Sequence, residues 1–194
     1  MSLVIAEIKD GVVYMGADTQ ISGELSRNNF TSESNLKIAK MPHGILIGCA
    51  GSQSVAYVLT CHKEWFEALG DDELSKAFLA TQIVPRFYNA LKSQDWLAKT
   101  APAKHKCSFL IAQKDRLFLL ESDFTVTVVP AYYAIGCGEC AAQVVQVGTH
   151  SGMHASTKEK MLHALRLADR FDNAVGAPYV FIDTKTLEFE FTEA

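Results

Sequence analysis

Four residues within the first 51 have the types and the order that an acyl-transfer site requires. Once Met1 is removed, Ser2 would carry a hydroxyl nucleophile and a free α-amine on one residue, and Asp18 follows sixteen positions later. Lys37 and Gly51 come next, the glycine at the end of an apolar run. A nucleophile, a base, a cation and a backbone amide donor are the parts of a site that attacks a carbonyl carbon. The sequence therefore predicts acyl-transfer chemistry near the start of the chain.

The composition is typical of a globular domain. The 194 residues, 48% hydrophobic and 21% charged, predict one domain over 1–194 with a large core. A net charge of −4 without a basic tract argues against a nucleic-acid partner. The sequence shows neither a membrane-spanning apolar run nor a signal-peptide pattern. Five irregularly spaced cysteines fit a reducing compartment, so we expect a cytoplasmic protein.

The elements that must position these four residues begin with a β-hairpin. Asp10-Gly11 is a strong hairpin signal and predicts strands over 3–9 and 12–17. The polar stretch 22–34 predicts a loop. Further apolar runs predict strands over 35–41, 45–50, 109–112, 117–121, 125–129, 132–135, 179–183 and 187–191.

Helical periodicity predicts four helical segments, over 52–68, 72–97, 139–147 and 157–171. Pro85 is expected to begin a new turn or to kink the second of these. The order of strands, helices, strands, helices and strands is satisfied by two antiparallel sheets with helices segregated outside them. The sequence therefore predicts an α+β fold.

Four stretches carry a resemblance to a known family, at Gly11–Asp18, Leu36–Ile38, Ile45–Gly51 and Ala134–Gly138. On these stretches the chain resembles the proteasome β-type subunits, and among them the bacterial HslV-type peptidases. Both belong to the N-terminal nucleophile hydrolases. The resemblance covers nearly the whole chain and implies a four-layer αββα sandwich.

The spacing of the candidate site residues also matches the family. The intervals from Ser2 to Asp18 and from Lys37 to Gly51 equal those of the family, whereas a short insertion lies between Asp18 and Lys37. The resemblance implies that the Ser2 hydroxyl attacks a peptide carbonyl while its α-amine, with an ordinary pKa near 7.7–8.0, accepts the proton. Lys37 would stabilise the developing alkoxide, Asp18 would hold Lys37, and the Gly51 amide would donate to the oxyanion.

Further site residues are implied by the resemblance alone. Cys137 and Asp172 would support the amine of Ser2. The primary specificity pocket would be lined by a set of mixed polarity that predicts no strongly charged substrate side chain. Its members would be Ile21, Asn35, Cys49 and Gln53. No cofactor and no metal are implied.

The chain departs from the family pattern at the nucleophile and around it. The family nucleophile is threonine, whereas Ser2 lacks the methyl group that restricts the rotamer. Cys137 and Val175 stand where the family has hydroxyl residues, which predicts a thinner hydrogen-bond network. A retained Met1 would turn the required amine into an amide and would block the mechanism.

The resemblance implies a peptidase that hydrolyses peptides or unfolded proteins inside a homo-oligomeric ring, with an ATP-dependent unfoldase among its partners. Two alternatives stay open. One is a catalytically inactive structural subunit of a ring, which a retained Met1 would favour. The other is an N-terminal nucleophile amidase acting on a small amide, which a deep, closed pocket would favour.

The stretch 136–141 resembles two other motifs. As Gly-x-Gly between a strand and a helix it imitates a dinucleotide-binding fingerprint, but hairpins rather than βαβ units surround it. Cys137 and Cys140 with His150 and His154 imitate a zinc-ligand set, although the gap between the two pairs is shorter than in a zinc finger. The simpler interpretation is a tight turn with two buried thiols, followed by a polar loop.

Overall fold

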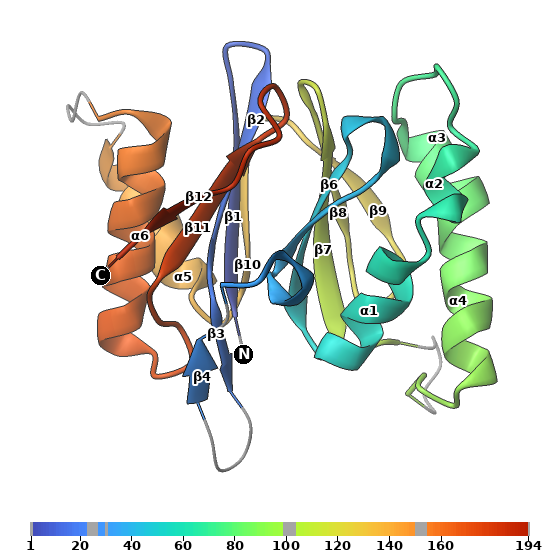
Figure 1. The fold of residues 1–194 in the computed structure, drawn as a ribbon, viewed down its shortest axis with the longest axis horizontal. Coiled ribbons are helices and arrows are strands. Elements are labelled where there is room, and N and C mark those ends of the chain that lie inside the picture. Colours follow the sequence, from blue (N-terminus) through green and yellow to red (C-terminus); the bar gives the residue numbers. More distant parts are fainter. Residues whose placement is uncertain (1, 23–26, 30, 99–103, 150–154, 194) are drawn as a thin grey trace.

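The computed structural model describes residues 2–22, 27–29, 31–98, 104–149 and 155–193. Two five-stranded antiparallel sheets pack face to face between two layers of helices (Figure 1). The first sheet has the order β10 (Tyr132–Gly136), β1 (Leu3–Lys9), β2 (Val12–Asp18), β11 (Tyr179–Asp183) and β12 (Glu190–Thr192). The second has the order β5 (Ile38–Lys40), β6 (Leu46–Gly51), β7 (Cys107–Gln113), β8 (Arg116–Leu120) and β9 (Val126–Val129).

Helices cover the outer face of each sheet (Figure 1). The first sheet is covered by α5 (Glu139–Thr149) and α6 (Thr157–Phe171). The second is covered by α1 (Gln53–Cys61), α2 (Glu64–Glu67), α3 (Lys76–Phe78) and α4 (Val84–Ser93), with a π-helical turn over Leu79–Ile83. The predicted α+β fold, an αββα sandwich, is confirmed. Among the described residues, no helix is both long and apolar enough to cross a bilayer.

The β1–β2 hairpin follows directly from its sequence. Lys9 pairs with Val12, and the two residues between them, Asp10 and Gly11, both have positive φ, as a two-residue type I′ turn requires. Along β1, Leu3 packs toward the outer helices and Val4 packs toward the other sheet. Because both faces of β1 are buried, its sequence is almost continuously apolar.

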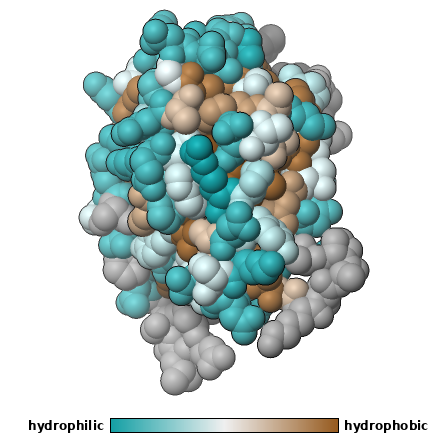
Figure 2. All heavy atoms as spheres, turned by 90° about the vertical axis from the view of Figure 1, so that its right-hand side faces the viewer, coloured by the Kyte–Doolittle hydropathy of each residue, from teal (hydrophilic) through white to brown (hydrophobic). Residues whose placement is uncertain are grey.

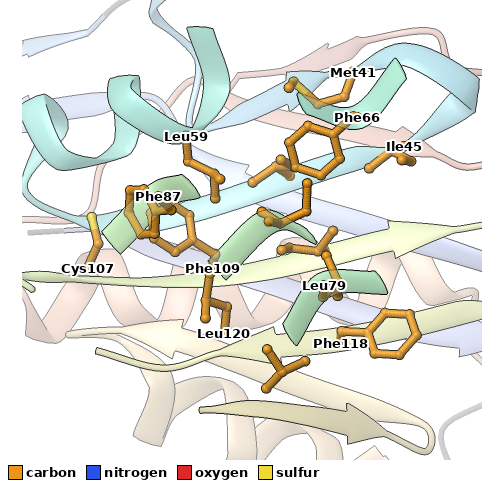
Figure 3. Packing of buried hydrophobic residues seen from close by; sticks show 14 of the residues in the cluster. Met41, Ile45, Leu59, Phe66, Leu79, Phe87, Cys107, Phe109, Phe118 and Leu120 are labelled. Atoms are coloured by element: carbon orange, nitrogen blue, oxygen red, sulfur yellow. The ribbon is translucent and has the colours of Figure 1, made fainter. Parts of the chain in front are cut away.

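Three hydrophobic clusters fill the spaces between the four layers. The inner cluster lies between the sheets, and one outer cluster joins the first sheet to α5 and α6. The other outer cluster joins the second sheet to the helices α1–α4, and Figure 3 shows Phe87 of α4 beside Phe109 of β7. Their ring centroids are 5.6 Å apart in an edge-on arrangement. On the solvent side of these helices, hydrophilic residues predominate and apolar residues gather in patches between them (Figure 2).

Helix α6 has the bounds that its sequence predicts and ends next to a candidate site residue. Ser156 and Glu159 form a capping box at its start. Met161, Leu165 and Ala168, spaced along one face, are buried against the first sheet. The helix ends at Asp172, whose amide donates to the carbonyl of Ala168 at 2.7 Å.

Several elements differ from their sequence prediction because tertiary contacts alter the local structure. The predicted loop over 22–34 is wrong in part, because β4 (Arg27–Asn29) pairs with β3 (Gln20–Ser22). The helix predicted over 52–68 is interrupted at His62, whose ring stacks on Trp65. The last strand begins at Glu190 rather than at Leu187, which has a φ of 56°. The amide of Leu187 donates to the carbonyl of Asp183, so the turn continues through this position.

The buried His105 makes the stability of the fold sensitive to acid. Its ring lies among Phe87, Phe109 and Phe124, with centroid distances of 5.2, 5.9 and 4.7 Å. Burial lowers the pKa of His105 from 6.5 to about 4, although the backbone of Glu121 and the carboxylate of Asp123 oppose the shift. The neutral ring is therefore the form that the folded protein prefers.

We expect the free energy of unfolding to fall as the pH decreases from about 6.5 to about 4, because the unfolded chain takes up the His105 proton first. At pH 5 His105 should lower the free energy of unfolding by an amount on the order of 1–2 kcal/mol, relative to pH 7. Urea denaturation at pH 7 and pH 5 measures the loss. His105→Phe should reduce that difference by the same amount, and an unchanged difference would contradict the prediction.

Candidate active site

One pocket of about 670 Å³ is lined by three of the four residues predicted to do acyl-transfer chemistry, namely Ser2, Lys37 and Gly51. The four residues that the resemblance assigned to the specificity pocket line it as well. They are Ile21, Asn35, Cys49 and Gln53. Asp18, Cys137 and Asp172 are not among the lining residues. Asp18 is fully buried and contacts Lys37, whereas Cys137 is exposed. The volume is in the range of small-ligand sites in proteins.

Hydrogen bonds from Cys137 hold the main chain of Ser2 in place. Ser2 is 7% exposed, and its carbonyl oxygen accepts hydrogen bonds from the Cys137 amide at 3.0 Å and the Cys137 thiol at 3.4 Å. Gly136 has a φ of 106°, and a Cβ atom there would lie 1.9 Å from the Ser2 carbonyl oxygen. Only glycine therefore lets β10 pass this close to the start of β1.

Asp18 and Lys37 form a buried ion pair. The Lys37 ammonium lies 2.6 Å from Asp18 Oδ2, and the two residues are 6% and 0% exposed. Asp18 also accepts from the Leu3 amide at 2.9 Å and from the Gln20 amide at 3.2 Å. Asp18 therefore ties the ammonium of Lys37 to the residue that follows Ser2.

Burial shifts the pKa of both partners in this pair. Desolvation lowers the pKa of Lys37, and the Asp18 carboxylate opposes that shift. Desolvation likewise raises the pKa of Asp18, against the effect of Lys37 and of the amides of Leu3 and Gly176. The ammonium is thus poorly solvated, so a negative charge that develops near it is stabilised more strongly than it would be in water.

The Gly51 amide faces the pocket because of the ladder geometry of β6. The Cys49 amide donates to the Lys37 carbonyl on the β5 side, whereas the Ser52 amide donates to Lys106 on the β7 side. Amides two residues apart on a strand point to the same edge, so the Gly51 amide points to the β5 side. Gly51 has a φ of 128°, and a Cβ atom would lie 2.2 Å from the Lys106 carbonyl oxygen. The position requires glycine.

Cys137 connects Ser2 to Asp172. The single S–H hydrogen of Cys137 is shared between the Ser2 carbonyl and the Asp172 carboxylate, and partial burial together with that carboxylate raises the pKa of the thiol to about 11. The bond to the carboxylate, with the Ala174 amide at 2.9 Å, holds the pKa of Asp172 below its ordinary value. Val175 is buried and adds no side-chain hydrogen bond.

The structure corrects the expected burial of two thiols. Cys137 and Cys140 are exposed, because the tight turn after β10 lies at the surface. His150 and His154 lie outside the described residues, and no group of three metal-ligating side chains occurs in the described part of the chain. Around this turn β10 pairs antiparallel with β1, which does not fit a dinucleotide-binding βαβ unit.

One wall of the pocket is a short hydrogen-bonded network. The Gln53 amide donates to the Tyr57 hydroxyl at 2.6 Å, and that hydroxyl donates to Asn35 Oδ1 at 3.3 Å. Tyr57 was not among the predicted site residues, although it follows Gln53 by one helical turn and so shares its face of α1. The Cys49 thiol donates to the Lys37 carbonyl, and burial raises its pKa to about 12, so it lines the pocket as a neutral group.

We expect that breaking the buried ion pair costs more stability than breaking an exposed one. Asp18→Asn leaves the Lys37 charge buried without its partner, and we expect a loss of about 3–5 kcal/mol in the free energy of unfolding. Adding Lys37→Met should recover part of this loss. Urea denaturation measures both effects.

A matched control is the exposed pair of Lys40 and Glu33, whose charged atoms are 3.0 Å apart. Glu33→Gln should cost less than about 1 kcal/mol because water screens this pair. An Asp18→Asn variant that is no less stable than Glu33→Gln would contradict the importance of the buried pair.

Comparison with known proteins identifies the fold. No family model and no curated protein matches the sequence. Solved structures do match: BPH of Thiobacillus denitrificans in complex with epoxomicin has a TM-score of 0.73 at 18% identity, over 93% of this chain and 97% of that chain. HslV from Trypanosoma brucei has a TM-score of 0.65 at 16% identity, over 93% and 98%.

A third structure of the same kind is Anbu, an ancestral beta-subunit, from Yersinia bercovieri. Its TM-score is 0.71 at 13% identity, over 98% of this chain and 86% of that chain. Identities this low show a shared fold, and all three structures have the proteasome type of N-terminal nucleophile hydrolase fold. The resemblance predicted from the sequence is confirmed at this level: the chain has the proteasome-type N-terminal nucleophile hydrolase fold.

Proposed function

We propose that this chain is a proteasome-like peptidase in which Ser2, after removal of Met1, hydrolyses peptide bonds. The observation that carries the proposal is the convergence of Ser2, Lys37 and Gly51 on one pocket, with Lys37 held 2.6 Å from Asp18. Met1 lies outside the described residues, so its removal stays a prediction.

The proposed reaction begins with attack of the Ser2 hydroxyl oxygen on the substrate carbonyl carbon. The hydroxyl proton passes to the neutral α-amine of the same residue, directly or through water. The Lys37 ammonium favours the neutral amine and stabilises the developing alkoxide. The Gly51 amide donates to the oxyanion of the tetrahedral intermediate, a role for which one donor is worth about 3–4 kcal/mol in other enzymes.

Collapse of the intermediate breaks the C–N bond. The departing amine takes the proton that the α-amine holds, and the acyl group stays on the Ser2 oxygen as an ester. Water then attacks the ester carbonyl carbon and gives a proton to the α-amine. When this second intermediate collapses, the ester C–O bond breaks, the Ser2 oxygen takes that proton back, and the acid is released. Cys137 supports this cycle by holding the carbonyl of Ser2 in place. Asp172, whose pKa is lowered, supplies a negative charge beside Cys137.

The assembly belongs to the proposal as well. The proteasome-type fold supports a homo-oligomeric ring, and we propose that the pockets face its inner chamber. We further propose that the ring lies in the cytoplasm and that an ATP-dependent unfoldase delivers unfolded substrates to it. Ile21, Asn35, Cys49 and Gln53 would contact the substrate side chain next to the cleaved bond. Their mixed polarity favours a neutral side chain at that position.

The experiment that tests the proposal uses the peptide epoxyketone epoxomicin, the compound bound to BPH in the complex of similar fold. An epoxyketone closes a ring with an amino alcohol: the hydroxyl adds to the ketone and the amine opens the epoxide. It therefore reports a hydroxyl and a free amine on one residue. We expect the intact mass of the protein to lack Met1 and to increase by one inhibitor.

Two variants make the result specific. Ser2→Ala should form no adduct, and it should leave the far-ultraviolet circular dichroism spectrum unchanged. Ser2→Thr should still form one, because it keeps the hydroxyl and the amine. A protein that retains Met1 and forms no adduct would reject the peptidase and favour an inactive structural subunit. Adduct formation together with hydrolysis of small amides but not of peptides would favour the amidase.

A further inference from the structure

Gln20 lies where the Asp18 side of the site meets the segment that follows Asp172. Its side chain is buried, with 7% of the residue exposed. Its backbone amide donates to Asp18 Oδ2 at 3.2 Å, and its side-chain nitrogen donates to the Asn173 carbonyl at 2.8 Å. Gln20 thus contacts both the Asp18 carboxylate and the loop that follows Asp172.

The loop leaves a slot for this side chain at Gly176. A Cβ atom at Gly176 would lie 2.3 Å from Gln20 Oε1. The Gly176 amide also hydrogen-bonds the Asp18 carboxylate. A methyl group at this position would displace the Gln20 side chain, whereas the backbone conformation of Gly176 does not itself favour glycine.

The same loop sets the position of Asp172. Within it, the Ala174 amide donates to Asp172 Oδ1, and the Val175 amide donates to the Asp172 carbonyl. The Asp172 carboxylate then shares the thiol hydrogen of Cys137 with the carbonyl of Ser2, which the Cys137 amide also holds. A displacement of the loop therefore displaces the carboxylate that is hydrogen-bonded to Cys137.

We propose that Gln20 is a positioning residue, which clamps the loop 172–176 against Asp18 and thereby places the Asp172 carboxylate beside Cys137 and Ser2. This inference rests on the proposed function. A neutral amide suits the position because its nitrogen donates to the Asn173 carbonyl and it carries no charge next to Asp18. A carboxylate there would not donate to Asn173 and would lie near Asp18, which has the same charge.

The first test is a double-mutant cycle on the rate constant for acylation of Ser2 by epoxomicin. Gln20→Ala should lower it 10- to 100-fold, because small displacements of supporting groups cost rates of this order. Gly176→Ala should do the same, since its methyl group displaces Gln20. The double variant should be no slower than either single variant, because the methyl group then occupies the vacated space.

The second test reads the position of Asp172 without using Ser2. The Asp172 carboxylate contributes to the raised pKa of the Cys137 thiol, about 11. In Gln20→Ala, the pH profile for alkylation of Cys137 by iodoacetamide should shift to lower pH. The alkylation profile of Cys140, which is read in the same experiment, should not change. Gln94 is an exposed glutamine at the end of α4 on the opposite helical layer, and Gln94→Ala should change the alkylation profile of neither cysteine.

The outcomes separate this inference from the proposed function. Multiplied losses in the double variant, or wild-type acylation and a wild-type Cys137 profile in Gln20→Ala, would overturn the positioning role. A lowered melting temperature with both readouts unchanged would leave Gln20 a structural residue only, which also overturns it. If the wild-type protein is not acylated, the proposed function fails, and the Cys137 profile alone decides the role of Gln20.

Discussion

The buried contact between Lys37 and Asp18 is the interaction on which the site depends. Taking both charges out of water is costly, and the cost is offset only when further hydrogen bonds satisfy the carboxylate. Here those bonds come from the amides of Leu3, Gln20 and Gly176. A single carboxylate therefore fixes β1, the start of β3, the strand region of Lys37 and the loop after α6, so the electrostatic requirement of one side chain sets the geometry of the pocket.

Close approach between segments is the second constraint, and three glycines make it possible: Gly51 and Gly136 lie against a backbone, and Gly176 lies against the side chain of Gln20. A Cβ atom would lie within 2.3 Å of a neighbouring oxygen at Gly51, Gly136 and Gly176. Each lies where two segments distant in sequence meet. The neighbours of Gly51, Gly136 and Gly176 are Lys106, Ser2 and Gln20, respectively. The segments that build the site are thus brought together at positions where a larger residue than glycine would collide with its neighbour.

The parts that could be predicted from the sequence are those with local causes. Asp10-Gly11 specifies its own turn, and the apolar period and the cap at Ser156 specify α6. The spacing of Ser2, Asp18, Lys37 and Gly51 led to the pocket because a family resemblance supplied their relation in space. What could not be predicted depends on long-range contacts: the β3–β4 pairing, the break at His62, the exposure of the Cys137 thiol and the place of Gln20 against Gly176.

The hold on Ser2 through peptide groups has a consequence for how such a site changes over time. The contacts that fix the residue run to its carbonyl oxygen and to the amide of Leu3, so none of them depends on the identity of the side chain. Location and reactivity are therefore separate properties of this position. In the proposed peptidase, a single codon change at this position would exchange one nucleophile for another, or remove it, while the scaffold that presents the residue is inherited intact.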